Sequence, residues 1–259
     1  MAESLQPSSR RPVRIWAASD LHGIDPATLA VQPDGCDLAI LAGDLCPLPD
    51  MSIRSVNSQP AWMNVVLGEW AASRPETQFV AIPGDHDVFL KRRDKPVMRG
   101  TVPTARRGDV SLPQNFHLLI DEGVDVCGLR VYGTPWIPYV DGRWAFEANS
   151  EVRERQWFDC IPDGTDVLVA HAPPRFDGLD ADVTLQFPTQ RLRHYGSRPL
   201  AEAITRSRPA LCVFGHVHSG DHSARRLECG TILRNVSVLN EDFTVSYPPS
   251  IFTLTPRYH

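Results

Sequence analysis

Short aliphatic runs, each followed at once by a polar loop, recur five times along this chain. The runs cover residues 14–18, 38–42, 79–82, 167–169 and 211–214. Uninterrupted apolar runs of this length are typical of strands that are buried on both faces, as in parallel sheets. The carboxyl ends of parallel strands meet at one edge of the sheet. We therefore expect the five loops that follow these runs to lie close together in space.

These loops concentrate histidine and aspartate. They hold five of the nine histidines, in the order Asp20-Leu21-His22, Gly43-Asp44, Gly84-Asp85-His86-Asp87, Ala170-His171 and Gly215-His216-Val217-His218. Carboxylate and imidazole donors without a cysteine among them suit hard or borderline divalent ions. The pattern predicts a pair of such ions and metal-assisted hydrolysis.

The rest of the pattern predicts an α/β fold. Apolar residues at helical spacing indicate helices at about 60–73, 148–159 and 199–207. A hairpin-like stretch is expected from three strands, at 116–120, 124–127 and 129–132, and the tail from 226 to 254 reads as three more short strands. The strand–helix–strand succession favours parallel pairing with right-handed crossovers. We predict two sheets packed face to face and flanked by helices.

The domain organisation follows from where this pattern begins. Residues 1–12 are rich in Ser, Pro and Arg and are expected to be a disordered leader, and 13–259 is expected to form a single domain. Two stretches with little periodicity, 88–114 and 173–197, are expected to be long loops that shape a pocket.

Composition excludes several classes of function. The formal net charge is −5 over 259 residues, which disfavours duplex nucleic acid as a partner because no basic excess neutralises its phosphates. The sequence has no apolar stretch long enough to predict a membrane span and no secretory signal pattern at its start. Its six cysteines show no CxxC spacing, so we expect reduced thiols and a cytoplasmic protein.

The five blocks together resemble a known superfamily. D-x-H, G-D, G-[D/N]-H-D, a single His after a strand, and G-H-x-H, in this order over roughly residues 14–218, are similar to the calcineurin-like metallophosphoesterases. The runs Val131-Tyr132-Gly133-Thr134-Pro135-Trp136 and His171-Ala172-Pro173-Pro174 resemble its metallophosphoesterase-domain-containing branch, which is similar to class III cyclic-nucleotide phosphodiesterases. The resemblance implies a four-layer α/β/β/α sandwich with metals at the sheet edge.

The same resemblance implies a role for each ligand position. Asp20, His22 and His218 would hold one ion, Asp85, His171 and His216 would hold the other, and Asp44 would bridge them. The cofactors implied are two divalent metal ions, Mn2+ or iron (Fe2+/Fe3+), with Zn2+ also admissible. A hydroxide bound to the ions would attack phosphorus, since coordination lowers the pKa of water to about 7 in favourable cases.

Two further residues of the third block carry implied catalytic roles. In the superfamily, the histidine at the position of His86 stands over the leaving-group oxygen, as a general acid or a hydrogen-bond donor. We expect Asp87 to hold the His86 imidazole in one orientation and to favour its protonated form. A capping role for Asp87 is the alternative.

Asp85 departs from the superfamily pattern, which usually has Asn at this position. A third ionised carboxylate removes one unit of positive charge from a site that holds two divalent ions. We expect tighter metal binding, a less acidified water and weaker attraction for a dianionic phosphate. Reduced activity, or a metal preference shifted towards Mn or Fe, is the expected consequence.

Substrate contacts are expected from the aromatic and basic residues of the loops. Part of the aromatic cluster at 136–146, with Trp136 as the candidate, would stack on a nucleobase, although a hydrophobic cover over the sheet explains the cluster as well. Arg143 and Arg175 are the candidate phosphate contacts.

These residues favour hydrolysis of a small phosphodiester, with a cyclic nucleotide as the leading substrate. One alternative keeps the site but acts on a phosphomonoester, a phosphoprotein or a pyrophosphate, because the ligand set is generic. Another is a weakly active nucleotide-binding module, which Asp85 keeps open. The partner expected is a small phosphorylated molecule, with no membrane. The oligomeric state is left open, with a homodimer as one option.

Overall fold

The structure is a computed structural model that describes residues 11–49, 53–91, 110–176, 178–181 and 194–257. The expected leader over 1–12 lies almost wholly outside these residues, as do large parts of the loops expected at 88–114 and 173–197. The described chain forms two sheets. The first has the strand order β11-β1-β2-β3-β4, made of β1 (Val13–Ala18), β2 (Leu38–Ala42), β3 (Gln78–Ile82), β4 (Phe116–Leu118) and β11 (Ser250–Leu254).

The second sheet has the order β5-β6-β7-β8-β10-β9. Its strands are β5 (Glu122–Val126), β6 (Leu129–Thr134), β7 (Val167–Ala170), β8 (Leu211–Phe214), β9 (Arg225–Arg226) and β10 (Ile232–Asn235). In both sheets the central strands pair in parallel and antiparallel strands lie at edges: β11 in the first sheet, β5 and β9 in the second. Both are therefore mixed sheets.

Burial on both faces explains the uninterrupted apolar runs. Alternate residues of β2, such as Leu38 and Ile40, join a core between the two sheets that also holds Val169 and Val213 of the second sheet. The residues in between, such as Leu41, pack instead against helices. A strand with a core on each side needs an apolar side chain at nearly every position, because both its faces are removed from water.

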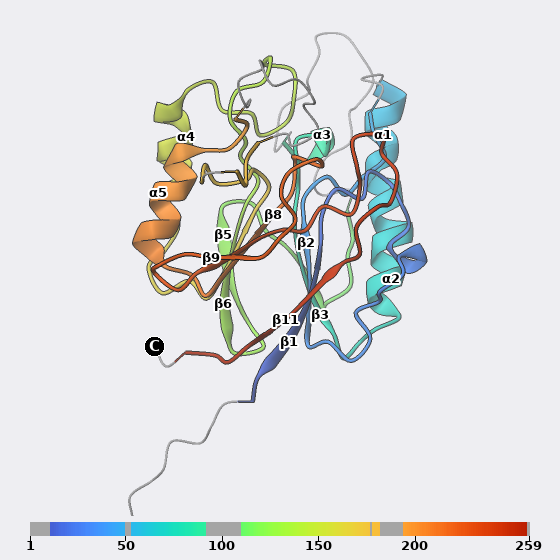
Figure 1. Cartoon of the computed structure of the whole chain (residues 1–259). Coiled ribbons are helices and arrows are strands. Elements are labelled where there is room, and N and C mark those ends of the chain that lie inside the picture. Colours follow the sequence, from blue (N-terminus) through green and yellow to red (C-terminus); the bar gives the residue numbers. More distant parts are fainter. Residues whose placement is uncertain (1–10, 50–52, 92–109, 177, 182–193, 258–259) are drawn as a thin grey trace, which may run out of the picture.

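Helices cover the outer face of each sheet. On the first sheet lie α1 (Ile53–Trp62), a π-helical segment (Met63–Leu67), α2 (Gly68–Ala72) and α3 (Val88–Lys91). A short 3-10 turn, Pro26–Thr28, lies between β1 and β2 in the chain. The second sheet is covered by α4 (Glu151–Phe158) and α5 (Arg198–Ser207). Figure 1 shows these helices on opposite sides of the strands. The predicted four-layer α/β/β/α fold is confirmed.

Two helical regions differ from the sequence-based prediction. The helix expected at 60–73 begins by Ile53, and Pro60 lies inside it, directly before the π-helical segment Met63–Leu67. Proline lacks the amide hydrogen of a regular helix, and wider helical turns accommodate such interruptions. A short helix, α3, occupies part of the loop expected at 88–114.

The predicted hairpin is only partly correct. β5 and β6 do form one, with Cys127 and Gly128 at its turn, both at positive φ. The segment expected at 116–120 instead forms β4, which pairs in parallel with β3 at the edge of the other sheet. A three-residue strand carries too little pattern to tell which sheet it joins. Among the described helices, none is long and apolar enough to cross a bilayer.

Candidate metal centre

Sharp turns in left-handed backbone conformation present the polar side chains at the strand ends. Asp20, His22, Asp44 and His216 have φ values of 58°, 44°, 52° and 68°. Such φ values are unfavourable for residues with a Cβ and gather where function requires an unusual geometry. The turns after β1 and β2 hold each other in place, because Asp20 N donates to the Gly43 carbonyl at 3.0 Å and His22 N to the Asp44 carbonyl at 2.9 Å.

Two glycines allow side chains from different turns to touch. A Cβ at Gly43 would lie 2.3 Å from His171 Nδ1, and a Cβ at Gly84 would lie 2.1 Å from Asp44 Oδ1 and 2.4 Å from Asp44 N. All three distances are shorter than those that real Cβ atoms show. The glycines of the G-D and G-D-H-D blocks are therefore required by close packing of the site.

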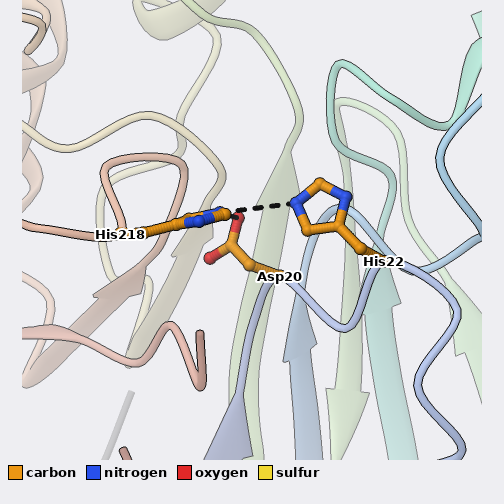
Figure 2. Close-up of side chains that lie close together, drawn as sticks. All are labelled: Asp20, His22 and His218. Atoms are coloured by element: carbon orange, nitrogen blue, oxygen red, sulfur yellow. Dashed lines mark hydrogen bonds and ion pairs between the residues drawn. The ribbon is translucent and has the colours of Figure 1, made fainter. Parts of the chain in front are cut away.

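Asp20, His22 and His218 form the first group of possible ligands. Their donor atoms all lie within 4.8 Å of one another, although the residues come from the ends of β1 and β8. His22 Nε2 lies 3.3 Å from His218 Nε2, and His218 Nε2 lies 3.5 Å from Asp20 Oδ1. Figure 2 shows the three side chains converging on one point. Asp20 is held there by the backbone N–H of His216, at 3.1 and 3.2 Å from its two oxygens.

Asp85, His171 and His216 form the second group. Asp85 Oδ1 lies 3.0 Å from His171 Nε2 and 2.9 Å from His216 Nδ1. Asp85 and His171 are buried and His216 is half-buried. Donor atoms of the three residues also lie within 4.8 Å of one another.

Asp44 lies between the two groups. Its Oδ1 accepts the backbone N–H of His86 at 2.9 Å, which fixes the carboxylate. Its Oδ2 lies 3.4 Å from His22 Nε2 of the first group and 3.5 Å from His171 Nε2 of the second. A single carboxylate oxygen therefore faces imidazoles of both groups.

Hydrogen bonds to carbonyls orient two of the imidazoles. His171 Nδ1 lies 2.9 Å from the Ala42 carbonyl, and His218 Nδ1 lies 3.1 Å from the Asn240 carbonyl. A carbonyl oxygen can only accept a hydrogen bond, so the ring nitrogen that faces it must donate. A neutral ring here therefore carries its proton on Nδ1 and directs the Nε2 lone pair into the site. Histidines that bind metals usually donate their other ring N–H to a carbonyl or carboxylate in this way.

The side chains of the site strongly perturb one another. Burial raises the pKa values of Asp20, Asp44 and Asp85, but the neighbouring histidines outweigh it and lower all three. Burial lowers the pKa of His218, but its contact with Asp20 outweighs that effect and raises it to about 9. The pKa of His171 is raised for the same reason, mainly by Asp44. Burial lowers that of His22 to about 4.

These values predict proton release when the protein takes up metal. The raised pKa values of His171 and His218 favour protonated rings in the metal-free protein, whereas metals bind neutral imidazole. Loading with Mn2+ should therefore release protons, and the metal affinity should rise with pH up to about 9, where His218 deprotonates. Titration calorimetry in buffers of different ionisation enthalpy measures this release. An enthalpy independent of the buffer would contradict it.

The donor set fits two divalent ions. Three carboxylates and four imidazoles from the two groups and Asp44 converge without a thiolate, which suits hard or borderline ions. Among the described residues the buried Nδ1 atom of His22 has no hydrogen-bond partner, so no hydrogen bond at that atom orients the ring. Metal coordination through Nε2, which faces Asp44 and His218, would fix the ring from its other side.

His86 lies beside this centre, but Asp87 does not orient it. His86 Nε2 is 3.7 Å from Asp85 Oδ2 and 4.0 Å from Asp44 Oδ2, and no described residue offers its Nδ1 a hydrogen-bond partner. The Asp87 carboxylate accepts the backbone N–H groups of Leu45, Cys46 and Gly84 at 2.8–3.0 Å.

The expectation that Asp87 holds the His86 imidazole is therefore wrong, because backbone amides occupy both of its oxygens. Asp87 instead ties the turn after β2 to the turn after β3. Burial and, secondarily, the charge of Asp44 raise the pKa of Asp87 to about 6.

A cavity of about 280 Å³ opens directly beside the centre. Asp85, His86 and His216 form its floor. Its walls come from four separate segments of the chain and comprise Val140, Trp144, Tyr195, Val217, Ser219 and Glu241. This cavity adjoins the centre on the side of His86, and we call it the substituent pocket.

None of the three expected substrate contacts lines the substituent pocket. The Trp136 indole stacks on Trp157 at 4.2 Å between ring centroids and donates to Asp121 Oδ2 at 2.7 Å. The Arg143 side chain is exposed and pairs with Asp141 two residues earlier. Arg175 also lies outside the lining. Two aromatic residues line the pocket instead: Tyr195, and Trp144, whose ring centroid lies 4.5 Å from that of His86.

Several residues that support the site have no signal in the sequence pattern. Gln59 of α1 is buried and donates to the His86 carbonyl at 2.9 Å. Asn240 orients His218 through its carbonyl, and Phe243 packs its ring edge-on against His22 and His218. A backbone carbonyl has no sequence signal. An aromatic residue in the tail points to no site until the tail is placed in space.

Comparison with known proteins agrees with this geometry. Residues 13–220 match the family described as calcineurin-like phosphoesterase. The chain is 29% identical over 258 residues to human metallophosphoesterase domain-containing protein 1, covering 94% of this chain and 72% of the relative. It is 29% identical over 261 residues to a UPF0046 protein of Caenorhabditis elegans, covering 91% of this chain and 60% of the relative.

The fold has solved counterparts as well. The structure of TT1561 of Thermus thermophilus superposes with a TM-score of 0.55 at 14% identity, covering 95% of this chain and 100% of that chain. The family match spans the five blocks and both groups of converging side chains. The chain therefore belongs to the calcineurin-like phosphoesterase family, which binds two divalent metals, and is a metal-dependent phosphoric ester hydrolase.

Proposed function

We propose that the chain hydrolyses small phosphodiesters, with cyclic nucleotides as the leading candidates. Asp20, His22 and His218 would hold one ion, and Asp85, His171 and His216 the other. Asp44 would bridge the two. The observation that carries the proposal is the position of Asp44 Oδ2, which faces imidazoles of both groups at 3.4 and 3.5 Å. Carboxylates commonly span paired ions in enzymes that hydrolyse phosphate esters.

The proposed ions are Mn2+ or iron, because the donors are carboxylates and imidazoles. When bound, such ions supply an activated water and neutralise the charge of the phosphoryl group. The chain itself supplies the fixed positions of the donors. His171 and His218 are oriented by carbonyls, and Asp20 and Asp44 by backbone amides.

His86 is the proposed proton donor to the leaving group. Its Nε2 is directed towards the carboxylates of Asp44 and Asp85, where the phosphate would bind, and its ring lies against Trp144. The backbone on both sides of the ring is fixed, since His86 N donates to Asp44 and its carbonyl accepts from Gln59. A donor in this place assists departure of an alkoxide, which would otherwise leave poorly near neutral pH.

Hydrolysis of bis(p-nitrophenyl) phosphate and p-nitrophenyl phosphate by the Mn-loaded protein tests the proposal. We expect a larger kcat/KM for the diester, because Asp85 adds negative charge beside the centre and disfavours a dianionic monoester. Asp85→Asn should lower metal affinity and shift this preference towards the monoester. A parent that favours the monoester or pyrophosphate would support the phosphomonoesterase or pyrophosphatase alternative instead.

Asp85 also favours a second candidate, a nucleotide-binding module of low activity. Its Oδ1 atom lies within 3.0 Å of both His171 Nε2 and His216 Nδ1, so a charged carboxylate stands between these two imidazoles. Tight nucleotide binding with turnover only in Asp85→Asn would support this candidate. Turnover by the parent at an ordinary rate would remove it.

A further inference from the structure

The substituent pocket combines apolar walls with a fixed carboxylate. Val140, Trp144 and Val217 supply carbon surface, and Trp144 is held at the centre by its contact with the His86 ring. Its backbone is held too, since the Trp144 carbonyl accepts from Lys91 Nζ at 3.1 Å and its N–H faces Glu147 Oε2 at 3.3 Å. A positioned indole beside an apolar wall suits a flat ring better than a branched or strongly solvated group.

Glu241 brings charge to the same cavity. Its Oε1 accepts the Ser219 N–H at 2.8 Å, which holds the carboxylate at the wall of the pocket. Asp85 contributes a second carboxylate at the floor. Two carboxylates beside an apolar wall attract N–H donors and repel an additional phosphate or carboxylate on the ligand.

We infer that the substituent pocket binds one organic group of a phosphodiester, a neutral aromatic ring bearing N–H donors. Trp144 is its stacking surface, and Glu241 selects against a second anionic group. This inference rests on the proposed function for the identity of the phosphate ester. It goes further by naming the class of the organic group and by assigning its recognition to Trp144 and Glu241, which lie outside the five sequence blocks. Pyrophosphates and nucleotides with further phosphates are then poor ligands of this site.

Binding of non-hydrolysable phosphonates separates the pocket from turnover. Above the second pKa of both acids, phenylphosphonate and methylphosphonate are dianions that differ in the ring, and calorimetry on the Mn-loaded protein measures both. The parent should bind the phenyl compound about tenfold more tightly, as expected for stacking on an indole. Trp144→Leu should remove most of this advantage while leaving the methyl compound unchanged. Tyr139→Leu, which removes an exposed ring of the same loop outside the pocket, should leave the advantage intact.

The methyl compound also reports whether each variant keeps an intact centre. If Trp144→Leu loses methylphosphonate binding as well, Trp144→Phe takes its place and should keep part of the ring advantage. Equal binding of the two compounds by the parent would overturn the inference. So would a ring advantage that survives in Trp144→Leu. Since no turnover is measured, these results stand whether or not diesters are hydrolysed.

The role of Glu241 has a matched test. Phenylphosphonate above its second pKa is a dianion, whereas methyl(phenyl)phosphinate is a monoanion with the same ring and no ester bond to hydrolyse. Glu241→Gln keeps the size and the acceptor for Ser219 but removes the charge, so it should improve dianion binding about threefold more than monoanion binding. Glu228→Gln, on an exposed residue outside the pocket, should change neither. An unchanged dianion-to-monoanion ratio in Glu241→Gln would refute selection by charge.

Discussion

Asp44→Asn should abolish most of the hydrolytic activity although it barely changes the size of the side chain. The Oδ1 position must remain an acceptor, because the backbone N–H of His86 donates to it at 2.9 Å. The amide NH2 group then occupies the Oδ2 position, which faces His22 Nε2 and His171 Nε2. A donor group there cannot bind a cation. We expect kcat/KM to fall on the order of a thousandfold, about 4 kcal/mol, together with metal affinity.

The control is Asp125→Asn, which removes the same charge from an exposed residue of β5. Its activity and metal content should match those of the parent. Metal content and thermal unfolding of Asp44→Asn, measured beside the assay, separate a loss of the site from a loss of the fold. A variant with nearly normal turnover would show that Asp44 does not bridge two ions.

Gly84→Ala should damage the site from outside the ligand set. The added Cβ would lie 2.1 Å from Asp44 Oδ1 and 2.4 Å from Asp44 N, and backbone cannot move aside as a flexible side chain can. Overpacking typically lowers the free energy of unfolding by about 1–3 kcal/mol. Because the contact here is with backbone, we expect this variant to lose about 3 kcal/mol or more. For a domain of this size the melting temperature should fall by roughly 2–4 °C per kcal/mol.

A second glycine provides the control for this variant. Gly68 begins α2, and a Cβ there would meet only ordinary contacts, the nearest at 3.5 Å. Gly68→Ala should leave stability unchanged or raise it by up to about 1 kcal/mol, because alanine favours helix. Scanning calorimetry and Mn2+ binding compare the two variants. Equal melting temperatures would mean that the turns after β2 and β3 are not packed as described.

Much of the site could be predicted from sequence because strand ends fix it. The apolar runs before Asp20, Asp44 and His171 are buried on both faces, as are those of β3 and β8, which lead to the other two blocks. Parallel strands then carry these residues to one edge whatever the loops do. The converging groups therefore follow from short local patterns.

The substrate side of the site could not be predicted in this way. Trp136 and Trp144 lie in the same aromatic loop and look equivalent in sequence, yet Trp136 stacks on Trp157 whereas Trp144 packs at a tilt against His86. Which ring faces the cavity depends on the path of an irregular loop. Asp87 illustrates a second limit, since its partners are backbone amides, and every residue except proline offers one.

Anomalous diffraction from crystals grown with Mn2+ tests the central claim most directly, because it locates the ions without reference to any substrate. We predict two peaks, one within the group of Asp20, His22 and His218 and one within the group of Asp85, His171 and His216. The two peaks should lie roughly 3.5–4 Å apart, the spacing of paired ions, and Asp44 Oδ2 should contact both of them. A single peak, or two peaks without Asp44 between them, would contradict the dinuclear centre.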